Sequence, residues 1–128
     1  MARILLIESD HILSDGITKI LTKNGHSVDW HVDPQAATDS ADKKTPQLII
    51  IDLMLGGRSG VEFLYELRSY PEWQKLPVII YSSVEPEEFG KGNFGFTQLG
   101  IVAHHYKPTT SLSQLAGSVK NVLKSVRV

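Results

Sequence analysis

The chain has 128 residues, which is the size of one typical domain and enough to bury a hydrophobic core without disulfides or a structural metal. Its 13 basic and 14 acidic residues give a formal net charge of -1, which excludes a general electrostatic attraction to nucleic acid or to an anionic membrane. The absence of cysteine excludes disulfides, thiol nucleophiles and cysteine zinc sites. We therefore expect a single domain over residues 1–128, with no direct nucleic-acid or membrane partner.

The first part of the chain alternates strand-like and helix-like patterns. Residues 4–7 form a short apolar run typical of a strand covered on both faces, and this run is too short for a secretion signal, so we expect a cytoplasmic location. A helical stripe follows and stops at Gly25; its members are Leu13, Ile17, Ile20 and Leu21. Residues 28–32 form the second predicted strand. Asp33 and Pro34 then begin a short helix, whose inward residues are Ala36, Ala37 and Ala41.

The middle of the chain contains its most hydrophobic β-branched run, residues 48–51, which stops abruptly at Asp52. The glycine-rich residues 56–60 predict a loop. A short helix follows as far as Tyr70 and carries Val61, Leu64, Leu67 and Arg68. Residues 78–81 predict the fourth strand, which ends at Ser82. Two buried strands in succession thus end on a polar side chain.

The last part of the chain begins with an ambiguous segment, residues 84–99. Three glycines in it each cost about 1 kcal/mol against alanine in a helix, so we expect a short, irregular or absent fourth helix. Residues 101–106 predict the fifth strand, and a clear amphipathic helix ends the chain, with Leu112, Leu115, Val119, Val122, Leu123 and Val126 on its apolar face. Strands joined by helical crossovers predict a doubly wound α/β fold with a five-stranded parallel sheet.

Polar side chains follow the first, third, fourth and fifth predicted strands. They are Glu8, Ser9, Asp10, Asp52, Ser82 and Lys107. Because the carboxyl ends of parallel strands meet at one edge of the sheet, these side chains should lie together. Carboxylates there can bind a hard divalent cation such as Mg²⁺, while a hydroxyl and an ammonium can hold phosphoryl oxygens. The set predicts phosphoryl transfer with Asp52 as the nucleophile.

Four segments in order resemble the motifs of receiver domains of bacterial response regulators, and the resemblance covers essentially the whole chain. They are residues 4–10 (ILLIESD), 48–60 (LIIIDLMLGGRSG), 77–83 (PVIIYSS) and 106–108 (YKP). The resemblance implies a flavodoxin-like (βα)5 fold with strand order 2-1-3-4-5. It implies that Asp52 is the phosphoacceptor, that Glu8, Asp52 and the backbone carbonyl of Met54 bind Mg²⁺, that Ser82 is the switch hydroxyl and that Lys107 pairs with the phosphate.

The same resemblance implies the partners. A sensor histidine kinase or a phosphotransfer protein would supply the phosphoryl group. A downstream protein would bind the face formed by the fourth helix, the fifth strand and the last helix. The chain would then act by binding and would not be an enzyme.

Three positions depart from the family pattern: Ser9, Gly56 and His104. Gly56 stands where proline is usual. Ser9 stands where a second acidic residue is usual, so we expect weakened Mg²⁺ binding unless Asp10 turns back into the site. This departure leaves open an alternative function, a pseudo-receiver that binds partners without being phosphorylated. His104 stands where an aromatic switch residue is usual; a structural role is the competing interpretation. We expect no metal site at His104 and His105, because adjacent strand residues point to opposite faces.

Two other functions share parts of this pattern. A flavodoxin-type electron carrier needs a phosphate-binding loop after the first strand, where Glu8 and Asp10 would repel a flavin phosphate. A phosphatase with an aspartate nucleophile would place it after the first strand with a second carboxylate two residues on, whereas Met54 follows Asp52 at that spacing. Trp30 and Trp73 are expected to serve in packing only.

Overall fold

A five-stranded parallel sheet forms the centre of the computed structural model, which describes residues 2–55, 58–85 and 99–125. Its strands are β1 (Arg3–Ile7), β2 (Ser27–His31), β3 (Leu48–Ile51), β6 (Val78–Ser82) and β7 (Ile101–Tyr106). Their spatial order is β2-β1-β3-β6-β7, and all neighbouring pairs are parallel. Counted among the sheet strands alone, this is the predicted order 2-1-3-4-5, so the predicted fold class is confirmed.

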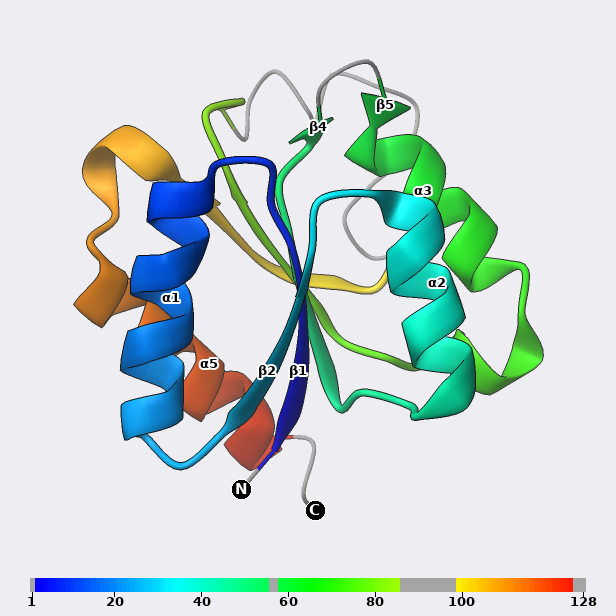
Figure 1. The fold of residues 1–128 in the computed structure, drawn as a ribbon, viewed down its shortest axis with the longest axis horizontal. Helices are drawn as coiled ribbons and strands as arrows, with labels where there is room; N and C mark the ends of the chain where they lie inside the picture. Colours follow the sequence, from blue (N-terminus) through cyan, green and yellow to red (C-terminus); the bar gives the residue numbers. More distant parts are fainter. Residues whose placement is uncertain (1, 56–57, 86–98, 126–128) are drawn as a thin grey trace.

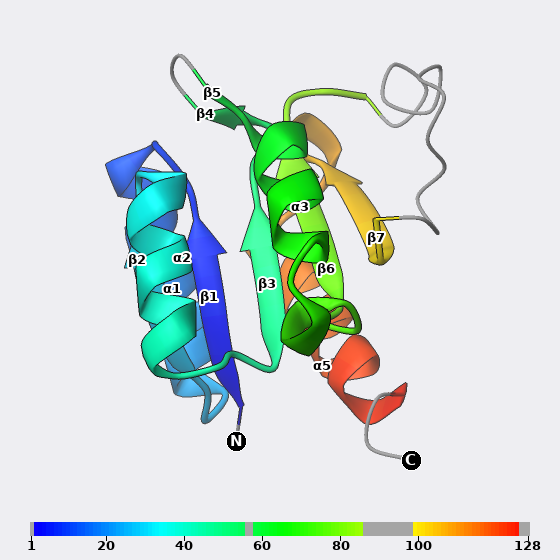
Figure 2. The ribbon, with the colours of Figure 1, turned by 90° about the vertical axis from the view of Figure 1, so that its right-hand side faces the viewer.

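Helices cover both faces of the sheet (Figures 1 and 2). Helices α1 (His11–Lys23) and α5 (Leu112–Ser125) pack on one face, and α2 (Pro34–Lys43) and α3 (Gly60–Arg68) pack on the other. Alternate strand residues supply the two cores: Leu5, Ile7, Ile49 and Ile51 face α2 and α3, whereas Ile4, Leu6, Leu48 and Ile50 face α1 and α5. A strand buried on both faces needs apolar residues at every position, which explains the continuous runs in the sequence.

Local signals set the helix ends. Asp10 caps α1, because its Oδ1 accepts hydrogen bonds from the backbone N–H groups of Ile12 and Leu13 at 3.0 and 3.1 Å. Asp33 caps α2 in the same way, and Pro34 occupies the first helical position, as predicted. Within the described ranges, no helix combines the length and the apolar character needed to cross a bilayer.

The structure corrects one prediction and leaves another outside its described part. Within the predicted loop, residues 56–60, Arg58–Ser59 form β5, which pairs antiparallel with β4 (Met54–Leu55), and Gly60 begins α3. Strands of two residues are too short to show an alternating pattern, so the sequence gives no sign of them. Two short 3₁₀ turns also occur, η1 (Pro71–Trp73) and η2 (Lys107–Thr109). The predicted irregular fourth helix, residues 84–99, falls mainly on residues 86–98, which lie outside the described residues.

Candidate functional site

Asp52 lies directly after β3, at the carboxyl end of the central strand. Its backbone N–H donates to the carbonyl of Ile7 at 3.1 Å, which fixes it against β1. The start of α3 approaches it closely: a Cβ on Gly60 would lie 2.5 Å from the carbonyl oxygen of Asp52, so no larger residue fits there. Asp52 is only 6% exposed. The fold therefore holds one carboxylate in a nearly closed position at the sheet edge.

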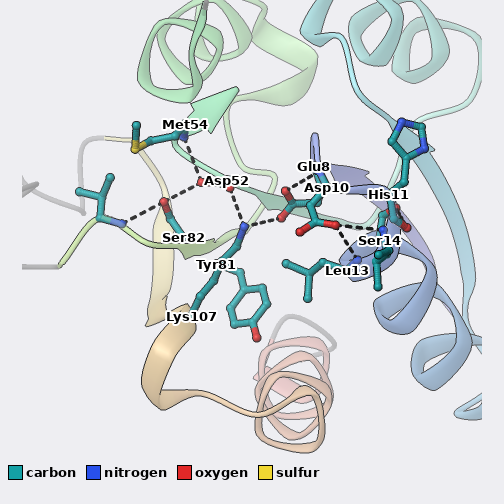
Figure 3. Close-up of polar contacts among 12 residues, drawn as sticks. Glu8, Asp10, His11, Leu13, Ser14, Asp52, Met54, Tyr81, Ser82 and Lys107 are labelled. Atoms are coloured by element: carbon teal, nitrogen blue, oxygen red, sulfur yellow. Dashed lines mark hydrogen bonds and ion pairs between the residues drawn. The ribbon is translucent and has the colours of Figure 1, made fainter. Parts of the chain in front are cut away.

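Both carboxylate oxygens of Asp52 have partners (Figure 3). Oδ1 accepts hydrogen bonds from the hydroxyl of Ser82 at 2.6 Å and from the backbone N–H of Met54 at 3.0 Å. Oδ2 accepts from the ammonium of Lys107 at 2.7 Å. The ends of β3, β6 and β7 thus meet around one carboxylate, with the cation and the hydroxyl that the sequence placed there.

Lys107 also pairs with Glu8, at 2.9 Å between Nζ and Oε1. Burial raises the pKa of Glu8, which is 2% exposed, and this outweighs the lowering by its hydrogen bond with Lys107. Burial would lower the pKa of Lys107, but its hydrogen bonds and charge interactions with Asp52 and Glu8 outweigh that effect, so its pKa is raised. The ammonium therefore stays charged and bridges two buried carboxylates.

Ser9 and Asp10 take no part in this ion-pair cluster. Ser9 is exposed, and Oδ1 of Asp10 is occupied in capping α1. The backbone N–H of Asp10 donates to Oε2 of Glu8 at 3.1 Å. Across the described part of the chain, no group of three or more His, Cys, Asp or Glu side chains is arranged to hold a metal ion. Metal binding by Asp10 stays a prediction, and coordination through Oδ1 would remove the helix cap.

The remaining donor set still suits Mg²⁺, which proteins commonly hold with one or two carboxylates and several waters. Glu8 and Asp52 provide two adjacent carboxylates, because a single ammonium contacts both. Lys107 is the counter-ion in this arrangement, so a bound cation would have to share or displace it. Glu8 and Asp52 therefore fit a weak site, while the Met54 carbonyl stays a predicted ligand.

Hydrogen bonds continue from Asp52 toward β7. The Ser82 hydroxyl, which donates to Asp52, accepts from the backbone N–H of Val84 at 3.2 Å. The Val84 carbonyl lies 2.9 Å from Nε2 of His104. His105 contacts a different element, the Ser118 hydroxyl on α5, at 2.8 Å. The two imidazoles thus contact different parts of the fold, while a switch role for His104 stays a prediction.

Sequence reasoning missed two aromatic residues that support the site. The indole N–H of Trp30 donates to the carbonyl of Glu8 at 2.8 Å, so this tryptophan does more than pack. The Tyr81 hydroxyl donates to the carbonyl of Thr110 at 2.8 Å, and the Lys107 ammonium lies 5.9 Å from the Tyr81 ring centre. Trp30 and Tyr81 both donate to backbone carbonyls. Every residue has such a carbonyl, so the sequence pattern does not indicate these hydrogen bonds.

Comparison with known proteins gives one consistent family. The response regulator receiver domain family matches residues 4–115. The chain is 37% identical over 81 residues to the transcriptional regulatory protein QseB of Escherichia coli O157:H7, covering 63% of this chain and 36% of that protein. It is 34% identical over 93 residues to response regulator RppA of Synechocystis, covering 70% of this chain and 39% of that protein. The matched region is thus less than half of each of these relatives.

Solved structures share the fold at lower sequence identity. The receiver domain of the Francisella response regulator 1452 matches with a TM-score of 0.83 and 23% identity, over 99% of this chain and 100% of that one. A sensor protein from Polaromonas sp. JS666 matches with a TM-score of 0.84 and 21% identity, over 96% of both chains. On the match over residues 4–115, this chain belongs to the response regulator receiver domain family.

Proposed function

We propose that the chain accepts a phosphoryl group on Asp52 from a sensor histidine kinase or a phosphotransfer protein and signals through a protein-binding surface. One observation carries this proposal: the buried Asp52 carboxylate is held by the Ser82 hydroxyl at 2.6 Å and the Lys107 ammonium at 2.7 Å. A hydroxyl and a cation at these positions can follow new phosphoryl oxygens as they form.

In the proposed reaction, a carboxylate oxygen of Asp52 attacks the phosphorus of a phosphohistidine. The P–N bond breaks, its electron pair returns to the imidazole ring, and an O–P bond forms on Asp52. Lys107 moves from a carboxylate oxygen to a phosphoryl oxygen and balances the added charge. Mg²⁺, when held by Glu8, Asp52 and the Met54 carbonyl, would neutralise part of the charge on the transferring group.

The signal would leave the site through Ser82. Its hydroxyl donates to Asp52 and accepts from Val84, whose carbonyl contacts His104. Moving the hydroxyl toward a phosphoryl oxygen would break its bonds with Asp52 and with the Val84 N–H and so release the Val84 segment. The populations of the β7 and α5 surface would then shift, which is the output expected of a cytoplasmic signalling protein that acts by binding.

The test is an amide NMR titration with Mg²⁺ and then beryllofluoride, a stable mimic of the aspartyl phosphate. We expect shifts near Asp52, Ser82 and Lys107 in the native protein and none in Asp52→Asn. Asp15→Asn is the matched control, because Asp15 is an exposed carboxylate on α1 and should leave the response intact. A response that persists in Asp52→Asn would contradict phosphorylation at this residue.

Two observations favour a second function, a pseudo-receiver that binds partners without phosphorylation. Ser9 is exposed where the family usually places an acid, and Lys107 already pairs with both Glu8 and Asp52. The same titration separates the two functions. Absence of any beryllofluoride response at millimolar Mg²⁺ would leave the pseudo-receiver as the function of this chain.

A further inference from the structure

A groove lies between α1 and α5, away from the Asp52 site. It has a volume of about 620 Å³, a floor that includes Ile20 and Ala116, and a rim that includes Lys23, Lys120 and Lys124. Helix α1 begins beside the site, and its 13 residues span roughly 20 Å, so Lys23 in its last turn lies far along the helix from Asp10. A partner in this groove would leave the Asp52 edge accessible.

The charged residues that line the groove are all basic. Its lining includes three lysines and His26, and no aspartate or glutamate. All three lysines are exposed, and within residues 2–55, 58–85 and 99–125 none of them forms an ion pair. By contrast, Lys19 on the same helix α1 pairs with Asp15 at 3.1 Å. Because the chain as a whole carries a net charge of -1, this concentration of unpaired positive charge is local to the groove.

Helix dipoles explain part of this arrangement. Lys23 and Lys124 lie in the last turns of α1 and α5, where a cation is favourable. That explanation does not extend to Lys120, which precedes the last turn of α5. It also gives no reason for the three lysines to surround one hollow with an apolar floor.

Gly117 is the second, independent feature of the groove. It lies within α5, where glycine destabilises a helix by about 0.5–1 kcal/mol relative to alanine. A Cβ at this position would meet nothing within 4 Å, so packing in the fold does not require glycine. The contrast is Gly16 on α1, where a Cβ would approach Leu112 to 2.9 Å. At Gly117 the missing side chain leaves the groove open.

We propose that this groove docks an acidic amphipathic helix of a partner protein. Apolar residues of that helix would lie on the floor beside Gly117, and its carboxylates would pair with Lys23, Lys120 and Lys124, as in other helix-in-groove interfaces. The concave apolar floor favours such a helix over nucleic acid or an anionic membrane, which would use the lysines and leave the floor empty. The proposal does not depend on phosphorylation of Asp52.

The probe is a capped 14-residue helical peptide with glutamate on one face and leucine on the other, added to the full chain and followed by amide NMR. We expect shifts at Lys23, Gly117 and Lys120. Reversing two charges in Lys120→Glu/Lys124→Glu should weaken binding by at least about tenfold. The control Lys43→Glu/Lys44→Glu makes the same charge change at the exposed end of α2 and should not alter binding.

Gly117→Leu tests the groove without changing charge. Leucine is a better helix former, so the variant should fold at least as stably as the native protein and should lose peptide binding. Asp52→Asn should bind the peptide normally, which keeps this test separate from the proposed phosphorylation. Four results would overturn the proposal: no shifts, equal binding of a peptide with glutamine in place of glutamate, full binding by Gly117→Leu, or stronger shifts with anionic vesicles or single-stranded RNA.

Discussion

Lys107 and Arg68 are two partly buried cations, and the protein compensates their charges in different ways. The Lys107 ammonium contacts the carboxylates of Glu8 and Asp52 at 2.9 and 2.7 Å. The Arg68 guanidinium instead donates to three backbone carbonyls, those of Trp73 at 2.6 Å, Leu76 at 2.5 Å and Leu99 at 2.9 Å. Carboxylates thus balance the charge of Lys107, whereas the dipoles of backbone carbonyls stabilise that of Arg68.

This difference separates a site that can change state from one that cannot. A carboxylate can take up a proton, a metal ion or a phosphoryl group, and each event alters what Lys107 must balance. A backbone carbonyl takes part in none of these reactions. Burial lowers the pKa of Arg68, yet a guanidinium stays charged in proteins, so its three hydrogen bonds do not depend on its protonation. Arg68 therefore ties the end of α3 to the chain that enters β6 and β7, while Lys107 serves the reactive edge.

The largest effect is expected for Lys107→Met, which leaves two buried carboxylates without a cation. We expect a loss of about 3 kcal/mol in the free energy of unfolding at neutral pH without metal, measured by urea denaturation. The loss should shrink on acidification, as Glu8, whose pKa is raised by burial, takes up a proton, and on addition of Mg²⁺. The control is Lys75→Met, at an exposed lysine. An equal loss at acidic and neutral pH would show that the ammonium acts through packing alone.

Arg68→Met should have the next largest effect, because it leaves three carbonyls without their donor. We expect the free energy of unfolding to fall by about 2 kcal/mol. Unlike the effect of Lys107→Met, this loss should be the same across the acidic and neutral range and insensitive to Mg²⁺, because carbonyls do not titrate. Arg68→Lys, which keeps the charge but not the planar fork, should recover only part of the stability. A strong pH dependence would place an acidic partner near Arg68 and would contradict the comparison.

Ser9→Asp adds a third carboxylate to the edge that Lys107 balances. We expect Mg²⁺ affinity to rise by about tenfold, measured by calorimetric titration, because carboxylate number sets affinity for hard cations. Ser9→Asn matches the size of the new side chain without its charge and should leave the affinity unchanged. Equal affinity in Ser9→Asp and the native protein would indicate that Asp10 already supplies the acidic ligand.

Glu8→Gln should have the smallest effect on the free energy of unfolding. Removal of this ion-paired carboxylate should stabilise the protein at neutral pH, whereas such a removal usually destabilises. The pKa of Glu8 is raised in the folded protein, so its contribution to stability is complete below about pH 4.3 and is lost as the pH rises through the folded pKa. Glutamine removes this loss, so the free energy of unfolding at neutral pH should increase, by less than about 1 kcal/mol. Urea denaturation between about pH 4 and pH 7 measures it, with exposed Glu66→Gln as the control. A decrease at neutral pH would show that the ion pair with Lys107 outweighs burial.

The contrast between these two cations also shows what could be predicted from the sequence. Lys107 was predicted because it ends a strand, and the carboxyl ends of parallel strands meet by topology. Asp52 and Ser82 were found for the same reason, and the apolar runs of β1, β3 and β6 predicted the centre of the sheet because both of its faces are buried there.

Arg68 was predicted only as a residue of a short helix, because its partners are backbone carbonyls, which every residue possesses. The hydrogen bond from Trp30 to the Glu8 carbonyl escaped prediction for the same reason. The hairpin of β4 and β5 was missed because two-residue strands leave no periodic pattern. Interactions that use side-chain chemistry at strand ends could be predicted, and those that depend on backbone position could not.

Ser9 and Asp10 differ in their structural roles, and this difference has an evolutionary consequence. Asp10 caps α1 and its backbone binds Glu8, whereas the exposed side chain at position 9 contributes little to holding the strand or the helix in place. Gain or loss of a carboxylate at position 9 should therefore alter metal affinity while leaving folding almost untouched. A lineage carrying this domain could lose its dependence on metal, and later regain it, through single amino-acid replacements that selection for stability would not oppose.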